Sequence, residues 1–239
     1  MVKNSIPNMI TSCNLLSGSL AVMLAMEGLF HCALGMIILG AVFDFFDGFT
    51  ARRLGVSGPM GVELDSLADC VTFGLAPSVM VVQSIRLSTA QSNYEWGWYA
   101  AVALIMAAFS ALRLAKFNID DRQHESFIGL PTPANALFWA SLVAAFPDMP
   151  SWGAWVPWVM IVWVLYSCYL LVSEHPFFSL KFKDYSWQNN AMRYLFLIGC
   201  VILIAICATV GCIRADYHPV CFAGTACIVW YAIMSAIIK

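Results

Sequence analysis

The chain has 239 residues, of which 61% are hydrophobic and only 11% are charged. Soluble domains carry about 25% charged residues. This composition, with a mean hydropathy of +0.78, therefore excludes an ordinary soluble protein and indicates an integral membrane protein. The formal net charge of −2 says nothing about topology, because orientation follows the Lys and Arg of the loops. No nucleic-acid partner is expected.

Apolar segments of about the length that spans a bilayer recur along the whole chain. Eight of them are predicted to be helices, at residues 9–26, 29–47, 66–85, 96–114, 133–147, 152–172, 194–213 and 219–238. We therefore expect an all-α integral membrane protein. It should form a single domain over residues 1–239, built as a bundle of about eight transmembrane helices.

Lys and Arg are distributed unevenly between the two ends of these segments. With the N-terminus in the cytoplasm, only Arg86 and Arg214 fall outside. The ten on the inner side are Lys3, Arg52, Arg53, Arg113, Lys116, Arg122, Lys181, Lys183, Arg193 and Lys239. Because inner loops are enriched in basic residues, we expect both termini in the cytoplasm.

The first apolar segment is similar in length to a signal peptide, but we expect a retained helix. Asn14 interrupts it and no A-x-A cleavage site follows. Asn8, Thr11 and Asn14 recur at i, i+3 and i+6, so they place polar groups along one helix face. Two interpretations stay open: capping and packing within the bundle, or one wall of a ligand pocket.

Four aspartates flank a glycine-rich stretch between the second and third segments. Asp44 and Asp47 are three residues apart, and Asp65 and Asp69 are four apart. On helices each pair shares one face, with Cβ atoms about 5–6 Å apart. The stretch between them, residues 48–61 (GFTARRLGVSGPMG), contains four glycines and a proline, a composition typical of a turn between two helix ends.

Four carboxylates close together are energetically costly in a membrane protein. An isolated Asp at the centre of a spanning helix costs about 2.5–3.5 kcal/mol, and like charges this close repel unless protons or cations intervene. Mg²⁺ and Mn²⁺ are hard ions that take oxygen ligands, so the cluster is a candidate divalent-metal site. The alternative is a solvated cluster at helix ends, which the shared helical spacing of both pairs disfavours.

The same stretch carries a D-x2-D-G-x2-A-R-x8-G-x3-D-x3-D motif. Its fixed positions are Asp44, Asp47, Gly48, Ala51, Arg52, Gly61, Asp65 and Asp69. The motif resembles the signature of the CDP-alcohol phosphotransferases, and P-N-x-x-T-x-x-N from Pro7 to Asn14 is similar to the start of the first helix in that family. The resemblance covers about residues 6–135, which would be the catalytic part, while residues 136–239 would add scaffold helices.

The resemblance implies a metal-dependent enzyme that uses CDP-diacylglycerol. Asp44, Asp47 and Asp65 would hold one Mg²⁺ or Mn²⁺ ion, and Asp69 would contribute to a second ion and act as general base. The implied CDP-diacylglycerol site consists of Asn8, Thr11, Asp44, Gly48, Ala51, Arg52, Gly61 and Asp65. The family also implies a homodimer in the cell (inner) membrane, with the site facing the cytoplasm.

A second stretch bears on the acceptor. R-L-A-K-F-N at residues 113–118 and F-x-G-L-P-T-P-A-N at residues 127–135 resemble one branch of the family, the phosphatidylserine synthases of bacterial and archaeal type. Taken alone, the basic residues are positive-inside anchors and the two prolines make a stiff helix start. The branch implies L-serine as acceptor, with phosphatidylserine and CMP as products. The candidate serine-binding residues are Arg113, Lys116, Asn118, Arg122, Thr132 and Asn135.

Other functions compete with this interpretation. Within the family, the acceptor could instead be glycerol 3-phosphate, inositol or the alcohol of an archaeal lipid variant. An ion-coupled transporter is disfavoured, because transporters often have two related halves and the acidic residues have no counterpart in the second half. The nine cysteines show no C-x-x-C pair and are expected to be packing residues. The last two apolar segments contain no acidic or basic residue and are expected to be scaffold or oligomer surface.

Overall fold

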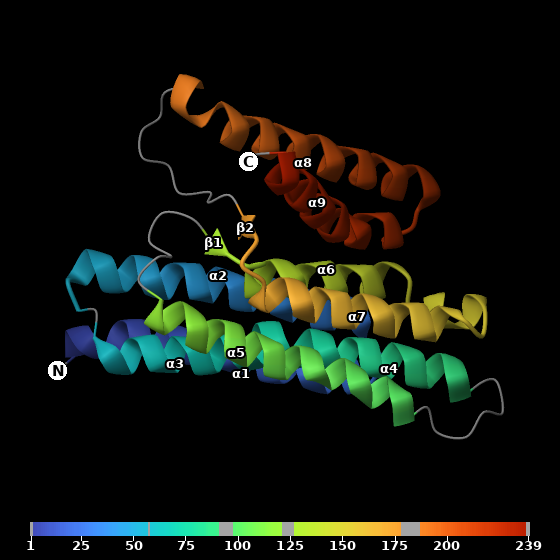
Figure 1. Ribbon diagram of the computed structural model, residues 1–239, viewed down its shortest axis with the longest axis horizontal. Coiled ribbons are helices and arrows are strands. Elements are labelled where there is room, and N and C mark those ends of the chain that lie inside the picture. Colours follow the sequence, from blue (N-terminus) through green and yellow to red (C-terminus); the bar gives the residue numbers. More distant parts are fainter. Residues whose placement is uncertain (1, 57, 91–97, 121–126, 178–186, 238–239) are drawn as a thin grey trace.

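The computed structural model describes residues 2–56, 58–90, 98–120, 127–177 and 187–237. Its elements are α1 (Val2–Met26), α2 (Phe30–Leu54), α3 (Pro59–Asp69), the π-helix η1 (Cys70–Leu75), α4 (Ala76–Ala90), η2 (Trp98–Leu104), α5 (Ile105–Ile119), β1 (Phe127–Ile128), α6 (Thr132–Ala145), η4 (Met149–Trp152), α7 (Val156–Val172), β2 (Pro176–Phe177), α8 (Trp187–Arg214) and α9 (His218–Ile237). Consecutive long helices run in alternating directions along the bundle (Figure 1).

The expected all-α membrane fold is confirmed. Six helical stretches are long and apolar enough to cross a membrane: Ser5–Met26, Phe30–Leu54, Pro59–Leu87, Tyr99–Ile119, Asn190–Arg214 and His218–Ile237. The other two expected segments are also helical but shorter, with 14 residues in α6 and 17 in α7. Among the described residues, strand structure is limited to β1 and β2, which pair antiparallel.

The short helix α6 lies at the centre of the bundle. Ten of its 14 residues are buried, and it packs against α2, α4 and α9. A helix surrounded by protein need not match the thickness of the hydrocarbon layer, since its neighbours shield it from lipid. Helix α8 lies at the edge of the bundle and packs mainly on α9 (Figure 1).

The helix α2 continues past the apolar segment that predicted it. It ends at Leu54, where Gly55 adopts a left-handed conformation with φ of 65°. The amides of Gly55 and Val56 donate to the carbonyls of Arg52 and Ala51, at 3.3 and 3.1 Å. This pattern is a Schellman-type cap, and glycine tolerates the positive φ that the cap requires.

The prediction of a turn across residues 48–61 is therefore wrong in extent. Helix α2 extends to Leu54 and α3 already begins at Pro59, where the missing amide hydrogen of proline costs nothing. Gly48 and Gly61 lie inside helices. As a result, all the motif residues project from regular helix at the spacing that brings each aspartate pair onto one face.

The third membrane-spanning segment is not a continuous α-helix. The six-residue π-helix η1 joins α3 to α4 and begins directly after Asp69. Pro77 follows η1 in the first turn of α4. Because π-helical turns are uncommon and recur at functional sites, this irregularity is consistent with a role for Asp69.

Close packing of α1, α2 and η1 fixes the helices that carry the acidic residues. A Cβ on Gly18 would lie 2.7 Å from the Cα of Thr72, and a Cβ on Gly40 would lie 2.6 Å from the Cγ2 of Thr72. The Thr72 hydroxyl donates to the backbone carbonyl of Asn14 at 3.0 Å. Small residues let membrane helices approach closely, and here they bring the polar face of α1 against the start of η1.

Candidate active site

Asp44 and Asp47 from α2 and Asp65 from α3 converge at one end of the bundle. Each offers a carboxylate oxygen, and these oxygens lie within 4.8 Å of one another. Asp47 is only 6% exposed, and Asp65 Oδ1 is buried without a hydrogen-bond partner among the described residues. Three hard oxygen ligands this close suit a divalent cation, which would also offset their mutual repulsion. We call these three residues the aspartate trio.

Asp69 lies outside the trio, one helical turn further along α3, and is 7% exposed. The side-chain amide of Asn14 donates to Asp69 Oδ1 at 3.0 Å. The hydroxyl of Thr11 donates to Asp47 Oδ2 at 2.6 Å. The polar face of α1 therefore orients one aspartate on each of the two acidic helices.

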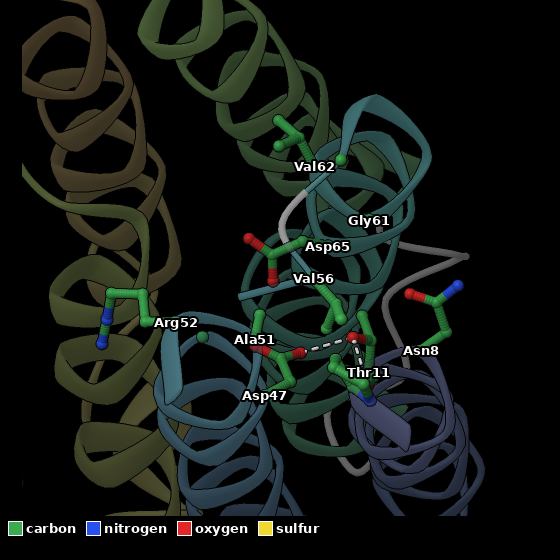
Figure 2. A pocket seen from close by; sticks show the side chains of 12 residues that line it. Asn8, Thr11, Asp47, Ala51, Arg52, Val56, Gly61, Val62 and Asp65 are labelled. Atoms are coloured by element: carbon green, nitrogen blue, oxygen red, sulfur yellow. Dashed lines mark hydrogen bonds between the residues drawn. The ribbon is translucent and has the colours of Figure 1, made fainter. Parts of the chain in front are cut away.

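An open pocket of about 180 Å³ lies beside the trio. Its lining residues are Pro7, Asn8, Thr11, Asp47, Gly48, Ala51, Arg52, Val56, Gly58, Gly61, Val62 and Asp65. They include every residue predicted for the CDP-diacylglycerol site except Asp44. Figure 2 shows Asp47 turned toward Thr11, whereas the Arg52 side chain extends away from that pair.

Two glycines leave their side of this pocket open. A Cβ on Gly48 would meet only the Arg52 guanidinium, at 3.7 Å, and one on Gly61 would meet only Asn8 Oδ1, also at 3.7 Å. Neither glycine has a positive φ, so backbone conformation does not require glycine there. Their missing side chains instead leave room for a ligand to approach the backbone.

A second polar region lies between α5 and α6. Arg113 is 7% exposed, and its Nη1 donates to Thr132 Oγ1 over a long distance of 3.4 Å. Its guanidinium lies 5.1 Å from the centre of the Phe117 ring, within range of a cation–π interaction. It is also close enough to Asp69 for their charges to interact. A buried guanidinium with so few partners is suited to bind an anion.

Buried polar atoms without partners gather around the two polar regions. Of the nine such atoms in the described part of the chain, seven belong to these regions: Asn14 Oδ1, Asp65 Oδ1, Ser110 Oγ, Arg113 Nε, Asn135 Oδ1 and Nδ2, and Ser235 Oγ; the other two are His218 Nδ1 and Trp230 Nε1. Asn135 is fully buried and lies three residues after Thr132, on the same helix face. Each unsatisfied group costs about 1–3 kcal/mol, a cost that a bound polar molecule would offset.

The structure separates the six candidate serine-binding residues into two groups. Arg113, Thr132 and Asn135 lie together in the buried polar region. Lys116 instead lies 3.9 Å from Glu174 in an exposed ion pair, and the amide of Asn118 donates to Ser66 Oγ at 2.8 Å. Arg122 lies outside the described residues, as do Lys181, Lys183 and Lys239 among the basic residues used to predict orientation.

One residue of this region was missed by sequence reasoning. Tyr231 of α9 is 5% exposed and is close enough to Arg113 for an electrostatic interaction. No spacing along the chain connects these two residues. The available signal was a tyrosine in an apolar helix, because a buried tyrosine hydroxyl usually needs a polar partner.

The fold and this site define a multi-pass membrane protein that gathers acidic side chains and a ligand pocket at one end of its helices. The sequence model of the CDP-alcohol phosphatidyltransferase family matches residues 4–166. Because the match covers more than half of the chain, the protein belongs to this family. The family was expected from the Asp44–Asp69 motif, and the expectation is confirmed.

Several characterised relatives are similar to the chain. A CDP-diacylglycerol–serine O-phosphatidyltransferase of Bacillus subtilis is 42% identical over 131 residues, which cover 54% of this chain and 70% of that protein. One of the same name from Mycobacterium leprae is 35% identical over 178 residues, covering 72% of this chain and 57% of the relative. Another from Methanocaldococcus jannaschii is 35% identical over 133 residues, covering 56% and 57%. The chain thus spans less than two thirds of the length of the latter two.

Proposed function

We propose that this chain transfers the phosphatidyl group of CDP-diacylglycerol to the hydroxyl of L-serine, giving phosphatidylserine and CMP. The observation that carries the proposal is the aspartate trio, whose oxygens lie within 4.8 Å of one another beside a pocket lined by Gly48, Gly61 and Arg52. The names of the relatives support serine as the acceptor. The buried, poorly satisfied Arg113 supports an acceptor that carries a carboxylate.

The aspartate trio fits a divalent cation, because its oxygens converge and Asp65 Oδ1 has no other partner within the described residues. We expect Asp44, Asp47 and Asp65 to hold one Mg²⁺ or Mn²⁺ ion, with Asp69 contributing to a second. Such ions, when bound, neutralise the charge of a diphosphate and favour departure of the nucleotide. The pocket beside the trio would receive the cytidine diphosphate, with Gly48 and Gly61 allowing its close approach.

The transfer forms a bond between the serine hydroxyl oxygen and the lipid-bearing phosphorus and breaks the bond from that phosphorus to CMP. The proton of the hydroxyl must pass to a base, and we assign this role to Asp69. It is buried next to the trio, and Asn14 holds its Oδ1. No hydrogen bond from a described residue reaches its Oδ2, which is therefore free to take the proton.

We place serine between Asp69 and Arg113. The guanidinium of Arg113 would pair with the α-carboxylate, while Thr132 and the side-chain amide of Asn135 would satisfy the remaining polar groups. In this arrangement the buried polar atoms of α5 and α6 gain the partners that they otherwise lack. The serine hydroxyl would then face the phosphorus held beside the trio.

The site lies at the end of the bundle where Lys and Arg are concentrated in the sequence, so we propose that it faces the cytoplasm from the cell (inner) membrane. Residues 6–135 would form the catalytic part and residues 136–239 would serve mainly as scaffold. We also propose that the protein forms a homodimer, because the family that it resembles implies one.

An acceptor panel tests the proposal directly. The purified chain, with CDP-diacylglycerol and Mg²⁺ or Mn²⁺, would be offered L-serine, inositol or glycerol 3-phosphate, and CMP release would be recorded. We expect release with serine and formation of phosphatidylserine. Release with inositol or glycerol 3-phosphate alone would reject serine as acceptor, and release with none of the three would reject the activity.

A further inference from the structure

The C-terminal helix α9 reaches the buried polar region around Arg113. It packs along α6 and contacts β2, and its final turns lie beside β2 (Figure 1). Tyr231 and Ser235, four residues apart on one face of α9, are 5% and 3% exposed. Both therefore point into protein rather than lipid. Neither lies within residues 4–166, which match the family.

The ring of Tyr231 is held in place from several directions. It belongs to a buried cluster with Leu130 and Ala134, residues on either side of Thr132 in the chain. Its ring stacks on Phe177 of β2, with centroids 5.7 Å apart, and meets Phe196 of α8 edge-on at 5.8 Å. A ring fixed in this way presents its hydroxyl at a defined position at little entropic cost.

The neighbouring polar groups favour an anionic ligand at this position. Arg113 Nε is buried without a partner among the described residues, and Nη1 has only the long contact to Thr132. Arg113 is close enough to both Asp69 and Tyr231 for electrostatic interactions with them. A carboxylate between the guanidinium and the tyrosine hydroxyl would accept hydrogen bonds from both, and such charge-assisted bonds are among the stronger ones in proteins.

We infer that Tyr231 is a specificity-determining residue of the acceptor site, and that its hydroxyl donates a hydrogen bond to the α-carboxylate that Arg113 binds. The inference rests on the proposed function, since it assumes an amino acid as acceptor. Helix α9 then forms one wall of the acceptor site, with Ser235 beside the tyrosine. An acceptor without a carboxylate could not accept charge-assisted hydrogen bonds from these two side chains.

The test combines Tyr231→Phe with a change in the acceptor. Wild type and variant would be assayed with L-serine and with L-serinamide, in which a neutral amide replaces the carboxylate. Loss of one hydrogen bond to a charged group should raise the KM for serine about 10-fold or more. The KM for serinamide, the KM for CDP-diacylglycerol and the kcat with serine should change little. Tyr217→Phe, at an exposed tyrosine just before α9, is the matched control and should match wild type.

The comparison separates this inference from the proposed function. If Tyr231→Phe leaves the KM for serine unchanged, or raises the KM values for serine and serinamide equally, the inference is wrong while serine transfer stands. If wild type releases CMP with inositol or glycerol 3-phosphate but not with serine, both fail. The phenylalanine variant keeps the ring contacts with Phe177 and Phe196, and an unchanged Tm would show that its effect is not loss of folding.

Discussion

Asp69 has a different environment from the other three aspartates of the motif. It lies outside the trio, is 7% exposed, and accepts a hydrogen bond from Asn14. A carboxylate held in this way has a fixed orientation and one oxygen left for the acceptor. Its position between the trio and Arg113 is where a base must lie if the acceptor binds at Arg113 and the nucleotide beside the trio.

Replacing Asp69 by Asn keeps the shape of the side chain but removes the base. We expect Asp69→Asn to lower kcat by about 10²–10⁴-fold while leaving CDP-diacylglycerol binding largely intact. CMP release and nucleotide binding, measured on the same preparation, check this. Asp148→Asn, at the opposite end of the bundle, is the control. Near-normal turnover by Asp69→Asn would show that the base lies elsewhere.

The trio predicts a different outcome for Asp44. Removing one of three converging carboxylates weakens cation binding, because the other two ligands do not complete the set. We expect Asp44→Asn to need at least about tenfold more Mg²⁺ or Mn²⁺ to raise Tm, since a ligand stabilises the folded state according to its affinity. Nucleotide binding should weaken with it. Glu63→Gln, at an exposed acid of α3, should behave as wild type, and a normal metal response in Asp44→Asn would contradict the site.

Gly48 tests whether the open face of α2 serves a ligand. A methyl group there meets no backbone atom of the protein within 4 Å, so Gly48→Ala should fold normally and gain slightly in helix propensity. In the pocket, however, the methyl group would collide with a bound diphosphate. We expect affinity for CDP-diacylglycerol to fall about tenfold, in line with a steric cost of about 1–3 kcal/mol. Gly35→Ala, on the same helix with nothing within 4 Å of the added carbon, should leave binding unchanged.

At the scale of the elements, the contact of α1 with η1 determines how Asn14 meets Asp69. Gly18 permits this contact, because any side chain there would meet the backbone of Thr72. We expect Gly18→Ala to push α1 away from η1, to reduce stability by about 1–3 kcal/mol and to lower activity through loss of the Asn14–Asp69 bond. Tm and CMP release measure the two effects. Gly35→Ala again provides the control, and equal Tm values for the two variants would contradict this packing.

Much of the fold could be predicted from the sequence, because apolar length sets the spanning segments and helical spacing sets which aspartates share a face. The end of α2 was misplaced because its last turn is polar. Its true limit depends on the αL cap at Gly55. The π-helix after Asp69 could not be predicted, since no local pattern marks it; within it, Thr72 packs closely against Gly18 and Gly40, which are distant in the sequence.

Part of the candidate site could likewise be predicted from the sequence, and part could not. The pocket beside the trio was predictable because most of its residues lie in one motif between Asp44 and Asp69, and the rest lie in the P-N-x-x-T-x-x-N stretch of α1. The proximity of Tyr231 to Arg113 was not, because it depends on how α9 packs against α6, two helices far apart in the sequence. Lys116 and Asn118 follow Arg113 in the same R-L-A-K-F-N stretch but project to Glu174 and Ser66. The prediction therefore assigned too many residues to the acceptor site, because it relied on their closeness to Arg113 in the sequence.

On the scale of the whole molecule, the two ends of the bundle differ in chemistry. The C-terminal ends of α2 and α5 and the start of α3, which carry the motif aspartates and Arg113, lie at one end, and the connection between α6 and α7 lies at the other (Figure 1). Divalent cations, serine and a cytidine nucleotide are water-soluble, so the proposed reaction requires the first end to open to the compartment that supplies them. The concentration of Lys and Arg in the loops predicts that this compartment is the cytoplasm.

This orientation can be measured with reporters fused along the chain. Because successive helices alternate in direction, an even number of crossings returns the C-terminus to the side of the N-terminus. We expect alkaline phosphatase, active only outside the cytoplasm, to be inactive when fused after Lys239 and active when fused after Trp152, in the turn between α6 and α7. A fluorescent protein that folds in the cytoplasm should give the opposite pattern. Phosphatase activity at both positions would imply an odd number of crossings in which α7, with 17 residues, does not span. Activity after Lys239 alone would instead indicate that α6, with 14 residues, does not span.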